Sequence, residues 1–97
     1  MQAVFEAISN TRRREILRLI WNQELSAGEI ASRFDVTWPA VSQSLGVLRR
    51  AGLITERRES NRRFYRADPD PLGPLRVALE QMWAEDLANL QRAVERR

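Results

Sequence analysis

Hydrophobic side chains recur at steps of three and four residues along most of this chain, which is the spacing of helices with one buried face. The pattern predicts a short first helix around residues 4–8 and a second helix over TRRREILRLIWN, residues 11–22. Two more helices follow between residues 26 and 52, separated by a turn at Asp35-Val36. A longer last helix is expected over residues 72–96, where the apolar stripe extends for about five turns.

Small polar residues mark the expected helix starts. Ser9 is predicted to cap the second helix, because its hydroxyl can accept an otherwise unpaired backbone N–H. Ser26 and Glu29 match the capping-box pattern S-x-x-E at the start of the third helix. Thr37 is predicted to cap the fourth helix, and Gly52 to end it, since glycine readily takes the left-handed conformation there.

Three consecutive arginines lie in the first turns of the second helix. Arg12, Arg13 and Arg14 oppose the helix dipole at this end, so a group outside the helix must compensate their charge. A nearby phosphate is one candidate. Glu15 or solvent is the other, and the sequence leaves the two open.

A β-hairpin is expected after the fourth helix. Leu53–Thr55 and Arg63–Arg66 predict two strands around a turn at residues 59–62. Asn61 tolerates a positive φ and is expected at the tip. Three prolines between residues 69 and 74 indicate a stiff connection to the last helix. The predicted fold class is therefore mainly α with a small β-hairpin, in the order α-α-α-α-β-β-α.

Composition narrows the class of protein. A chain of 97 residues with 43% hydrophobic and 30% charged residues is typical of one globular domain, here residues 1–97. No apolar run approaches the roughly 20 residues that span a bilayer, and the start MQAVFEAISN lacks a signal-peptide pattern. Because the chain contains no cysteine, no disulfide framework is expected, and a cytoplasmic location is predicted.

The positive charge is concentrated in one region. The whole chain carries a net charge of +3, but residues 49–66 alone hold seven arginines against Glu56 and Glu59, a local charge of +5. A run of charges is usually a solvated surface. Directly after two short helices joined by a turn, however, it favours contact with nucleic-acid phosphates.

The outward face of the fourth helix suits the DNA major groove. Val41, Leu45 and Leu48 share one face because each residue turns by 100°, which leaves small polar residues opposite. Gln43 can pair with an adenine edge. Trp38 either contacts DNA or only covers the turn, and a solvated helix face is the alternative for the whole surface. The predicted DNA contacts are Thr37, Trp38, Ala40, Ser42, Gln43, Arg49, Arg50, Arg57, Arg58, Asn61, Arg62 and Arg63.

These segments resemble the ArsR-type (ArsR/SmtB) family of bacterial transcription regulators. NTRRREILRLI is similar to the family's opening helix, LSAGEIASRFDVTWPAVSQSLGVLRRAGLI to its helix-turn-helix, and ERRESNRRFYRAD to its wing. The resemblance covers nearly the whole chain. It implies a winged helix-turn-helix, with the helix-turn-helix at residues 26–52, the wing at 53–67 and a dimerisation helix at 72–96.

The resemblance also implies a homodimer joined through the first and last helices. The alternative for the last helix is packing within its own chain. Two subunits would place their reading helices about 34 Å apart, in successive major grooves of an inverted-repeat operator. The predicted interface residues are Val4, Phe5, Ile8, Leu79, Met82, Trp83, Leu87, Leu90 and Val94.

The chain departs from the family pattern at its ligand-binding positions. The family's metal sensors place cysteines where this chain has Ser26 and Gly28, and others use histidines on the last helix. This chain has no Cys and no His, so we expect neither a metal site nor a cofactor, and the usual groups for catalysis are missing. Gly46 and Ser44 replace a basic residue and a histidine that are common in the family, which shifts the expected contacts toward the wing.

The sequence therefore predicts a DNA-binding transcription regulator that is not an enzyme. We expect a dimeric repressor that acts without a metal ion, and one version of this prediction is that it represses its own operon. Two alternatives stay open. One is a winged-helix module that binds protein instead of DNA; the other is a repressor controlled by a small organic ligand near Trp21 or Trp83.

Overall fold

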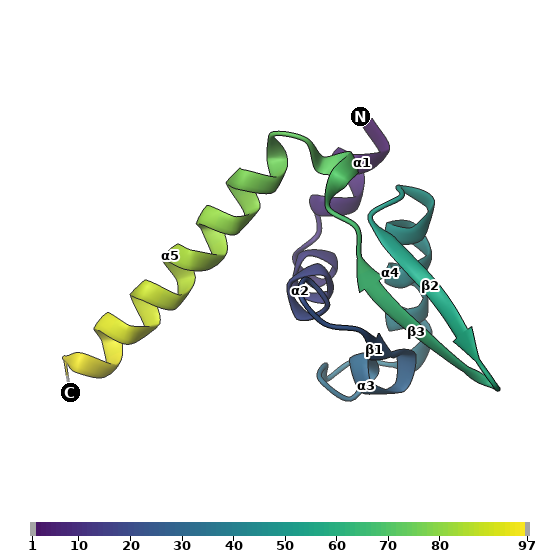
Figure 1. The fold of residues 1–97 in the computed structure, drawn as a ribbon. Helices are drawn as coiled ribbons and strands as arrows, with labels where there is room; N and C mark the ends of the chain where they lie inside the picture. The colour runs from purple at the N-terminus through teal and green to yellow at the C-terminus, as the bar shows by residue number, and fades with distance from the viewer. Residues whose placement is uncertain (1, 97) are drawn as a thin grey trace.

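The computed structural model describes residues 2–96 and is mainly helical, with one small antiparallel sheet (Figure 1). The predicted order of four helices, two hairpin strands and a last helix is confirmed, with an added strand before the third helix and a 3-10 turn before the last. The elements are α1 (Gln2–Ile8), α2 (Thr11–Leu19), β1 (Leu25–Ser26), α3 (Ala27–Ala31), α4 (Trp38–Arg50), β2 (Ile54–Glu59), β3 (Arg62–Ala67), η1 (Asp70–Leu72) and α5 (Leu75–Glu95). None of the described helices is both long and apolar enough to cross a bilayer.

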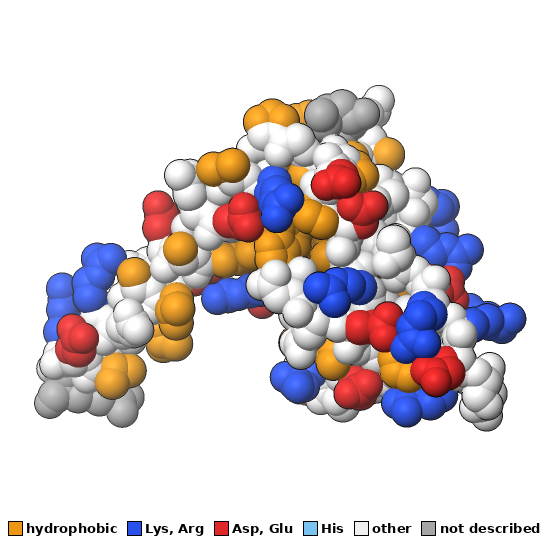
Figure 2. Space-filling view, viewed as in Figure 1, with side chains coloured by type: hydrophobic (Ala, Val, Ile, Leu, Met, Phe, Trp, Pro, Cys, Tyr) orange, Lys and Arg blue, Asp and Glu red, His pale blue; other side chains and the backbone are white. Residues whose placement is uncertain are grey.

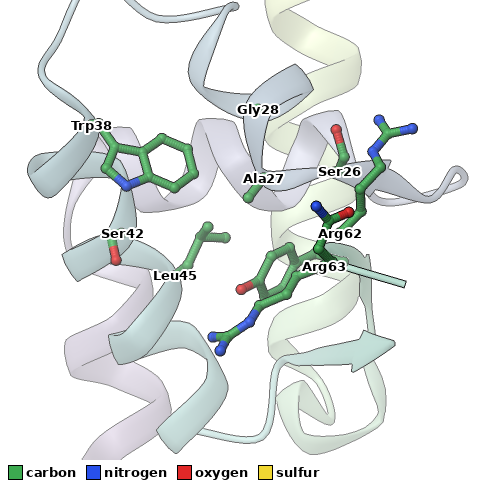
Figure 3. Close-up of a pocket in the computed structure, with 10 residues that line it drawn as sticks. Ser26, Ala27, Gly28, Trp38, Ser42, Leu45, Arg62 and Arg63 are labelled. Carbon is green, nitrogen blue, oxygen red and sulfur yellow. The ribbon is translucent and has the colours of Figure 1, made fainter. Parts of the chain in front are cut away.

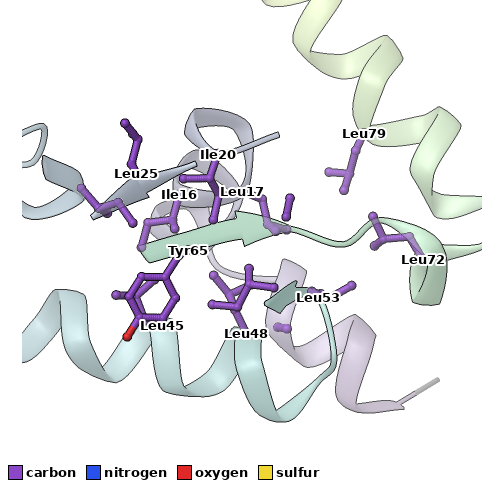
Figure 4. Close-up of a cluster of buried hydrophobic side chains, with 14 of the residues drawn as sticks. Ile16, Leu17, Ile20, Leu25, Leu45, Leu48, Leu53, Tyr65, Leu72 and Leu79 are labelled. Atoms are coloured by element: carbon purple, nitrogen blue, oxygen red, sulfur yellow. The ribbon is translucent and has the colours of Figure 1, made fainter. Parts of the chain in front are cut away.

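The hydrophobic core lies where α2, α4 and the sheet meet. Ile16 and Leu17 of α2 and Ile20 at its C-cap are fully buried, and Leu48 of α4 faces them (Figure 4). Leu53, at the end of the loop from α4 into the hairpin, is also fully buried. Each such side chain stabilises the fold by about 1.5–3 kcal/mol through burial of its apolar surface, so this cluster fixes how α4 sits on the body of the protein.

The helix N-caps agree with the sequence at two of three predicted positions. Ser26 and Glu29 form the complete capping box, with Ser26 Oγ accepting from the Glu29 N–H at 3.1 Å and the Glu29 carboxylate accepting from the Ser26 N–H at 3.0 Å. Thr37 caps α4 as predicted. The prediction for Ser9 is wrong by one residue: Asn10 caps α2, and the Ser9 hydroxyl donates to the Glu6 carbonyl oxygen at the end of α1.

Two of the three arginines at the start of α2 bind the end of α1, a partner that was not among those predicted. Arg13 Nε donates to the Ala7 carbonyl oxygen at 2.7 Å, and Arg13 Nη2 donates to the Glu6 carbonyl oxygen at 2.7 Å. Arg14 Nη1 donates to the Ile8 carbonyl oxygen at 2.7 Å. The last carbonyls of a helix have no partner inside it and carry a partial negative charge, so the two cations hold α1 against α2.

The hairpin is longer than predicted, and its tip is displaced by one residue. β2 and β3 pair antiparallel from Ile54↔Ala67 to Glu59↔Arg62, which leaves Ser60-Asn61 as a two-residue turn. The positive φ falls on Ser60, at 59°, and the prediction of Asn61 for this conformation is wrong. A two-residue turn that has positive φ at its first central position matches the twist of the flanking strands.

A third strand joins the helix-turn-helix to the wing. Leu25 pairs with Tyr65 and Ser26 with Phe64, so the sheet has the order β1-β3-β2. Two residues are too few to show the alternation that predicts a strand. The consequence is that α3 begins directly from the edge of the wing.

The last helix begins three residues later than predicted. Leu72 lies in the 3-10 turn and is fully buried, and Gly73 has φ of 56°, which ends that turn before α5 starts at Leu75. Leu79 and Trp83 pack into the core. Beyond Trp83 no described residue of α5 is buried, and the helix projects away from the rest of the chain (Figure 1).

Trp21, which lies at the edge of the core, contacts α5 through both its ring and its indole N–H. Its ring meets that of Trp83 edge-on, with 4.9 Å between centroids, and its Nε1 donates to a Glu80 carboxylate oxygen at 3.3 Å. Arg18 and Asp86 add a longer ion pair at 3.9 Å. These contacts set the direction in which α5 leaves the body of the protein.

The contact between α1 and α2 yields the first prediction. Arg13→Ala should lower the free energy of unfolding by about 1–3 kcal/mol, because it leaves the Ala7 carbonyl oxygen at the end of α1 without its donor. Urea unfolding followed by circular dichroism measures this change. Arg12→Ala is the matched control: Arg12 forms no side-chain hydrogen bond among the described residues, so its effect should stay within about 0.5 kcal/mol. Equal effects of the two variants would contradict the role given to Arg13.

Candidate nucleic-acid interface

Helix α4 presents one face to the core and the other to solvent, as the sequence predicted. Val41, Leu45 and Leu48 are 0%, 4% and 0% exposed. Ser42 and Gln43 lie exposed on the other side of the helix. The core therefore holds α4 in a fixed rotation, with its polar side chains outward.

Gly46 makes room for Arg50 on this outward face. A Cβ placed on Gly46 would lie 3.3 Å from Arg50 Nη1, so the guanidinium folds back along the helix across the glycine. Glycine in a helix interior costs about 1 kcal/mol relative to alanine. In this protein that cost accompanies an arginine that lies against the helix surface at the glycine.

On one face of the wing, Glu56 connects the hairpin to the end of α4. Its carboxylate forms ion pairs with Arg49 of α4 and with Arg63 of β3, the latter at 3.3 Å. The Glu56 side chain is only 17% exposed. Arg58 lies directly across from Arg63 in the hairpin and lines the same hollow as Arg49, Glu56 and Arg63, but only Arg49 and Arg63 pair with the carboxylate.

Arg57 belongs to the opposite face of the hairpin, because successive residues of a strand point to opposite sides. It donates to Glu24 at 2.7 Å and to Glu59 at 2.9 Å, and its guanidinium lies 4.7 Å from the centre of the Phe64 ring. The hydrogen bonds from Arg57 lower the pKa of Glu24, and those to Glu24 and Glu59 raise the pKa of Arg57. Arg57 therefore binds two carboxylates and also lies over an aromatic ring.

A cleft of about 540 Å³ lies between α4 and the wing and brings five of the predicted residues together. Figure 3 shows Trp38 and Ser42 of α4 on one side of the cleft and Arg62 and Arg63 on the other. Asn61 at the tip of the hairpin also lines it.

The other predicted residues lie around this cleft. The Thr37 hydroxyl is used for capping, and Ala40 is half-buried. Gln43, Arg50 and Arg58 are exposed and form no ion pair among the described residues. Basic and acidic side chains alternate over the wing in the space-filling view (Figure 2).

Three residues important for this surface were not predicted. Glu24 and Glu56 hold arginines of both faces of the wing, and Tyr65 forms part of the cleft. The alternation of Ile54 and Glu56 along β2 does indicate that Glu56 points toward the body. Glu24 carries no such signal, because its position depends on the pairing of the two-residue strand β1.

No group of three or more His, Cys, Asp or Glu side chains within residues 2–96 is arranged to hold a metal ion. Ser26, at one position where the family's sensors have cysteine, uses its hydroxyl in the capping box. Gly28 has no side chain to contribute.

Comparison with known proteins gives a consistent set of similarities. A family model described as "Bacterial regulatory protein, arsR family" matches residues 10–56. The HTH-type transcriptional regulator Rv2034 of Mycobacterium tuberculosis is 34% identical over 91 residues, which is 94% of this chain and 85% of that protein. The transcriptional repressor SdpR of Bacillus subtilis is 37% identical over 65 residues, covering 67% of this chain and 72% of its own.

A protein named as a transcriptional activator is also similar to this chain. The transcriptional activator HlyU of Vibrio cholerae is 42% identical over 62 residues, 64% of this chain and 57% of that protein. The solved structure of HlyU superposes with a TM-score of 0.74 at 33% identity, covering 84% of this chain and 89% of that one. The winged helix-turn-helix fold is therefore shared with solved structures of transcriptional regulators.

The capping box that starts α3 predicts a pH dependence. Hydrogen bonds from the Ser26 backbone N–H and then from its hydroxyl lower the pKa of Glu29 below its ordinary value of 4.5. A carboxylate with a lowered folded pKa stabilises the fold above pH 4.5, and this stabilisation is lost as the pH falls through the folded pKa. In Glu29→Gln the box can still form, but nothing titrates at this position. Wild type should therefore lose its stability advantage over Glu29→Gln below about pH 4.5, measured by thermal unfolding at a series of pH values. A constant difference between the two proteins across this range would rule out the lowered pKa.

Proposed function

Because the chain belongs to the ArsR family of bacterial regulatory proteins, we propose that it is a sequence-specific repressor that binds double-stranded DNA. Regulators of this family act on double-stranded DNA. The observation that carries the proposal is the placement of two elements on one side of the protein. The polar face of α4 and the arginines of the wing flank the same cleft.

Helix α4 is proposed to enter the major groove. Its 13 residues extend about 20 Å, and the groove is about 12 Å wide. Ser42 and Gly46 keep the outward face narrow, which allows a close approach to the bases. Gln43 is the proposed base-reading residue because its amide both donates and accepts, as an adenine edge requires. Arg50, lying over Gly46, is placed for a contact beside it.

The wing is proposed to bind the phosphate backbone. Arg58, Arg62 and Arg63 supply the charge there, and Asn61 is placed at the tip. Arg49 shares Glu56 with Arg63, so a phosphate competes with a carboxylate for both guanidinium groups. Arg57 is proposed to keep its place beneath the hairpin, on Glu24 and Glu59.

The projecting part of α5 is proposed to bind a second copy of the chain. The stripe that buries Leu79 and Trp83 continues along the same helix face as Leu87, Leu90 and Val94, which are 52–62% exposed. Orange side chains follow this part of the helix in Figure 2. A stripe that continues beyond its own core needs another apolar surface to cover it.

The predicted interface residues differ in how exposed they are in the single chain. Val4, Leu79 and Trp83 are buried in the core of their own chain, so the proposed interface rests on the other predicted residues. Ile8 and Met82 are half-buried at the edge of that core. Phe5, at 52% exposed, is the residue of α1 that is proposed to meet the partner together with the end of α5.

The repressor is proposed to act without a metal ion, a cofactor or a catalytic step. With no Cys and no His, the side chains that bind zinc and related metals most readily are missing from the sequence. Among its relatives, SdpR is named a repressor and HlyU an activator. We propose repression, including repression of its own operon, because a dimer bound to an operator blocks access to that DNA.

Two substitutions test the DNA-binding surface. With a duplex selected from a random-sequence pool, Gln43→Ala should cost about 1–3 kcal/mol at one base position and relax the preference there. Arg62→Ala should weaken binding to all sequences alike and reduce the slope of log affinity against log salt by about 0.9. Fluorescence anisotropy over a salt series measures both effects, and the affinity should be the same with EDTA or with added Zn²⁺. Binding that does not change with salt, or no binding to any duplex at low salt, would favour the protein-binding alternative.

A charge on the stripe of α5 tests the dimer. Leu90→Glu should weaken self-association by roughly tenfold or more, because each subunit loses about 1.5–3 kcal/mol of apolar burial and gains a charge in the interface. Gln81→Glu places the same charge on the opposite face of α5 and should leave association unchanged. Sedimentation equilibrium distinguishes the two. A wild-type protein that stays monomeric at micromolar concentration would overturn the proposed interface.

A further inference from the structure

Glu56 is the most enclosed of the carboxylates around the wing. Its side chain is 17% exposed, whereas those of Glu24, Glu29 and Glu59 are 33–67% exposed. The two carboxylate oxygens of Glu56 have different partners. Oε2 accepts from Arg49 Nη1 at the end of α4, and Oε1 lies 3.3 Å from Arg63 Nε in β3. One carboxylate therefore joins an arginine of the helix to an arginine of the hairpin.

A hollow of about 440 Å³ surrounds this carboxylate. The described residues that line it are Arg49, Glu56, Arg58 and Arg63, so three positive charges stand against one negative charge. Arg58 forms no ion pair among the described residues. The side chains of Arg49 and Arg63 are 59% and 50% exposed, so both guanidinium groups stay within reach of a second anion. The hollow therefore keeps an excess of positive charge even with Glu56 in place.

The hollow lies beside the proposed DNA-binding surface. Arg63 lines both the hollow and the cleft between α4 and the wing. Arg62 points away from Arg63, as Figure 3 shows, and lines only the cleft. Arg49 belongs to the last turn of α4, the helix that is proposed to enter the major groove. The hollow is therefore placed for a phosphate that flanks the groove occupied by α4.

A carboxylate and a phosphate offer an arginine the same kind of partner. Both place negatively charged oxygens where a guanidinium group can donate to them, and both form charge-assisted hydrogen bonds. Glu56 therefore makes, within the chain, the contacts with Arg49 and Arg63 that a DNA phosphate could make from outside it.

We propose that Glu56 stands in for a DNA phosphate in the free protein and thereby lowers the affinity of the wing for DNA of any sequence. This inference rests on the proposed function. In the complex, a backbone phosphate takes the place of the carboxylate on Arg49 and Arg63. Glu56 is thus a positioning residue that acts through these two arginines. Because it weakens the contacts that every sequence offers, binding depends more on the contacts of α4 with the bases.

Competition with phosphate outweighs the benefit of holding the two arginines in place. An ion pair between exposed side chains restrains them only weakly. A carboxylate that stays close to a bound phosphate repels it, and each phosphate that the wing neutralises releases counterions whatever the sequence. Removal of the carboxylate should therefore strengthen DNA binding, whereas a role in structure alone predicts weaker binding.

The first experiment tests the hollow without DNA. Thermal unfolding of the full chain is followed in about 50 mM inorganic phosphate and in sodium chloride of the same ionic strength. In Glu56→Gln the hollow is left to three arginines, so phosphate should raise Tm by at least about 3 °C relative to chloride. Wild type should show a difference below about 1 °C, because its own carboxylate occupies the hollow. An equal shift in wild type and Glu56→Gln, or no shift in either, overturns the proposal.

Glu59→Gln is the matched control. It removes the same charge from the same strand, but Glu59 points to the opposite face of the hairpin and pairs with Arg57. Its Tm should differ between phosphate and chloride by less than about 1 °C, as in wild type. A shift as large as that of Glu56→Gln would show a general effect of net charge and would overturn the assignment to the hollow.

The second experiment measures DNA binding by fluorescence anisotropy, with the selected duplex and with a scrambled duplex of the same length. Glu56→Gln should bind both duplexes about 5–10-fold more tightly at about 0.1 M salt. The slope of log affinity against log salt should become steeper by about 0.9, because one more phosphate charge is neutralised. Glu59→Gln should change the affinity less than about twofold. Equal gains in the two variants, or weaker binding by Glu56→Gln, would overturn the proposal.

Together the two experiments separate this inference from the proposed function. If no variant binds a duplex but phosphate stabilises Glu56→Gln alone, the proposed function is wrong, and Glu56 still occupies an anion site. If wild type binds the selected duplex and Glu56→Gln binds it no more tightly, the proposed function stands and the role given to Glu56 is refuted.

Discussion

The short pairing between β1 and β3 determines where the other parts of the interface lie. Leu25 pairs with Tyr65 and Ser26 with Phe64, so the start of α3 and the base of the wing are joined by backbone hydrogen bonds. The same Ser26 caps α3, which sets the direction of the helix-turn-helix from the edge of the sheet. A shift of one residue in this register would turn Tyr65 out of the core and move the wing relative to α4.

The charges of the wing follow from this arrangement. A hairpin of arginines alone would repel itself, and Glu56 and Glu59 on β2 together with Glu24 before β1 reduce that repulsion on both faces. These ion pairs are exposed or half-exposed, where each contributes little to folding. Their main effect is to position the arginines. Arg49 and Arg63 share the Glu56 carboxylate, which holds the end of α4 next to the wing. Binding to a DNA phosphate, as proposed, would exchange one anion for another at these guanidinium groups.

Most of the helices and the outward face of α4 were predictable, because a core side chain every three or four residues and a capping box are local signals. The conformation of Ser60 and the cap at Asn10 were missed by one residue each, since neighbouring small polar residues serve equally well in isolation. The partners of Arg13 and Arg57 were not predictable. They depend on where α1 ends and on how Glu24 approaches the hairpin, and both are consequences of the tertiary fold.

Helix α5 shows why one periodic pattern can serve two purposes. Its apolar spacing is the same at Leu79 and Trp83 as at Leu90 and Val94, yet only the first pair is covered by its own chain. The contacts of Trp21 with Trp83 and Glu80 fix the angle at which the exposed end of α5 leaves the rest of the protein. In a dimer built on this stripe, that angle would set the separation of the two α4 helices and hence the spacing of the half-sites.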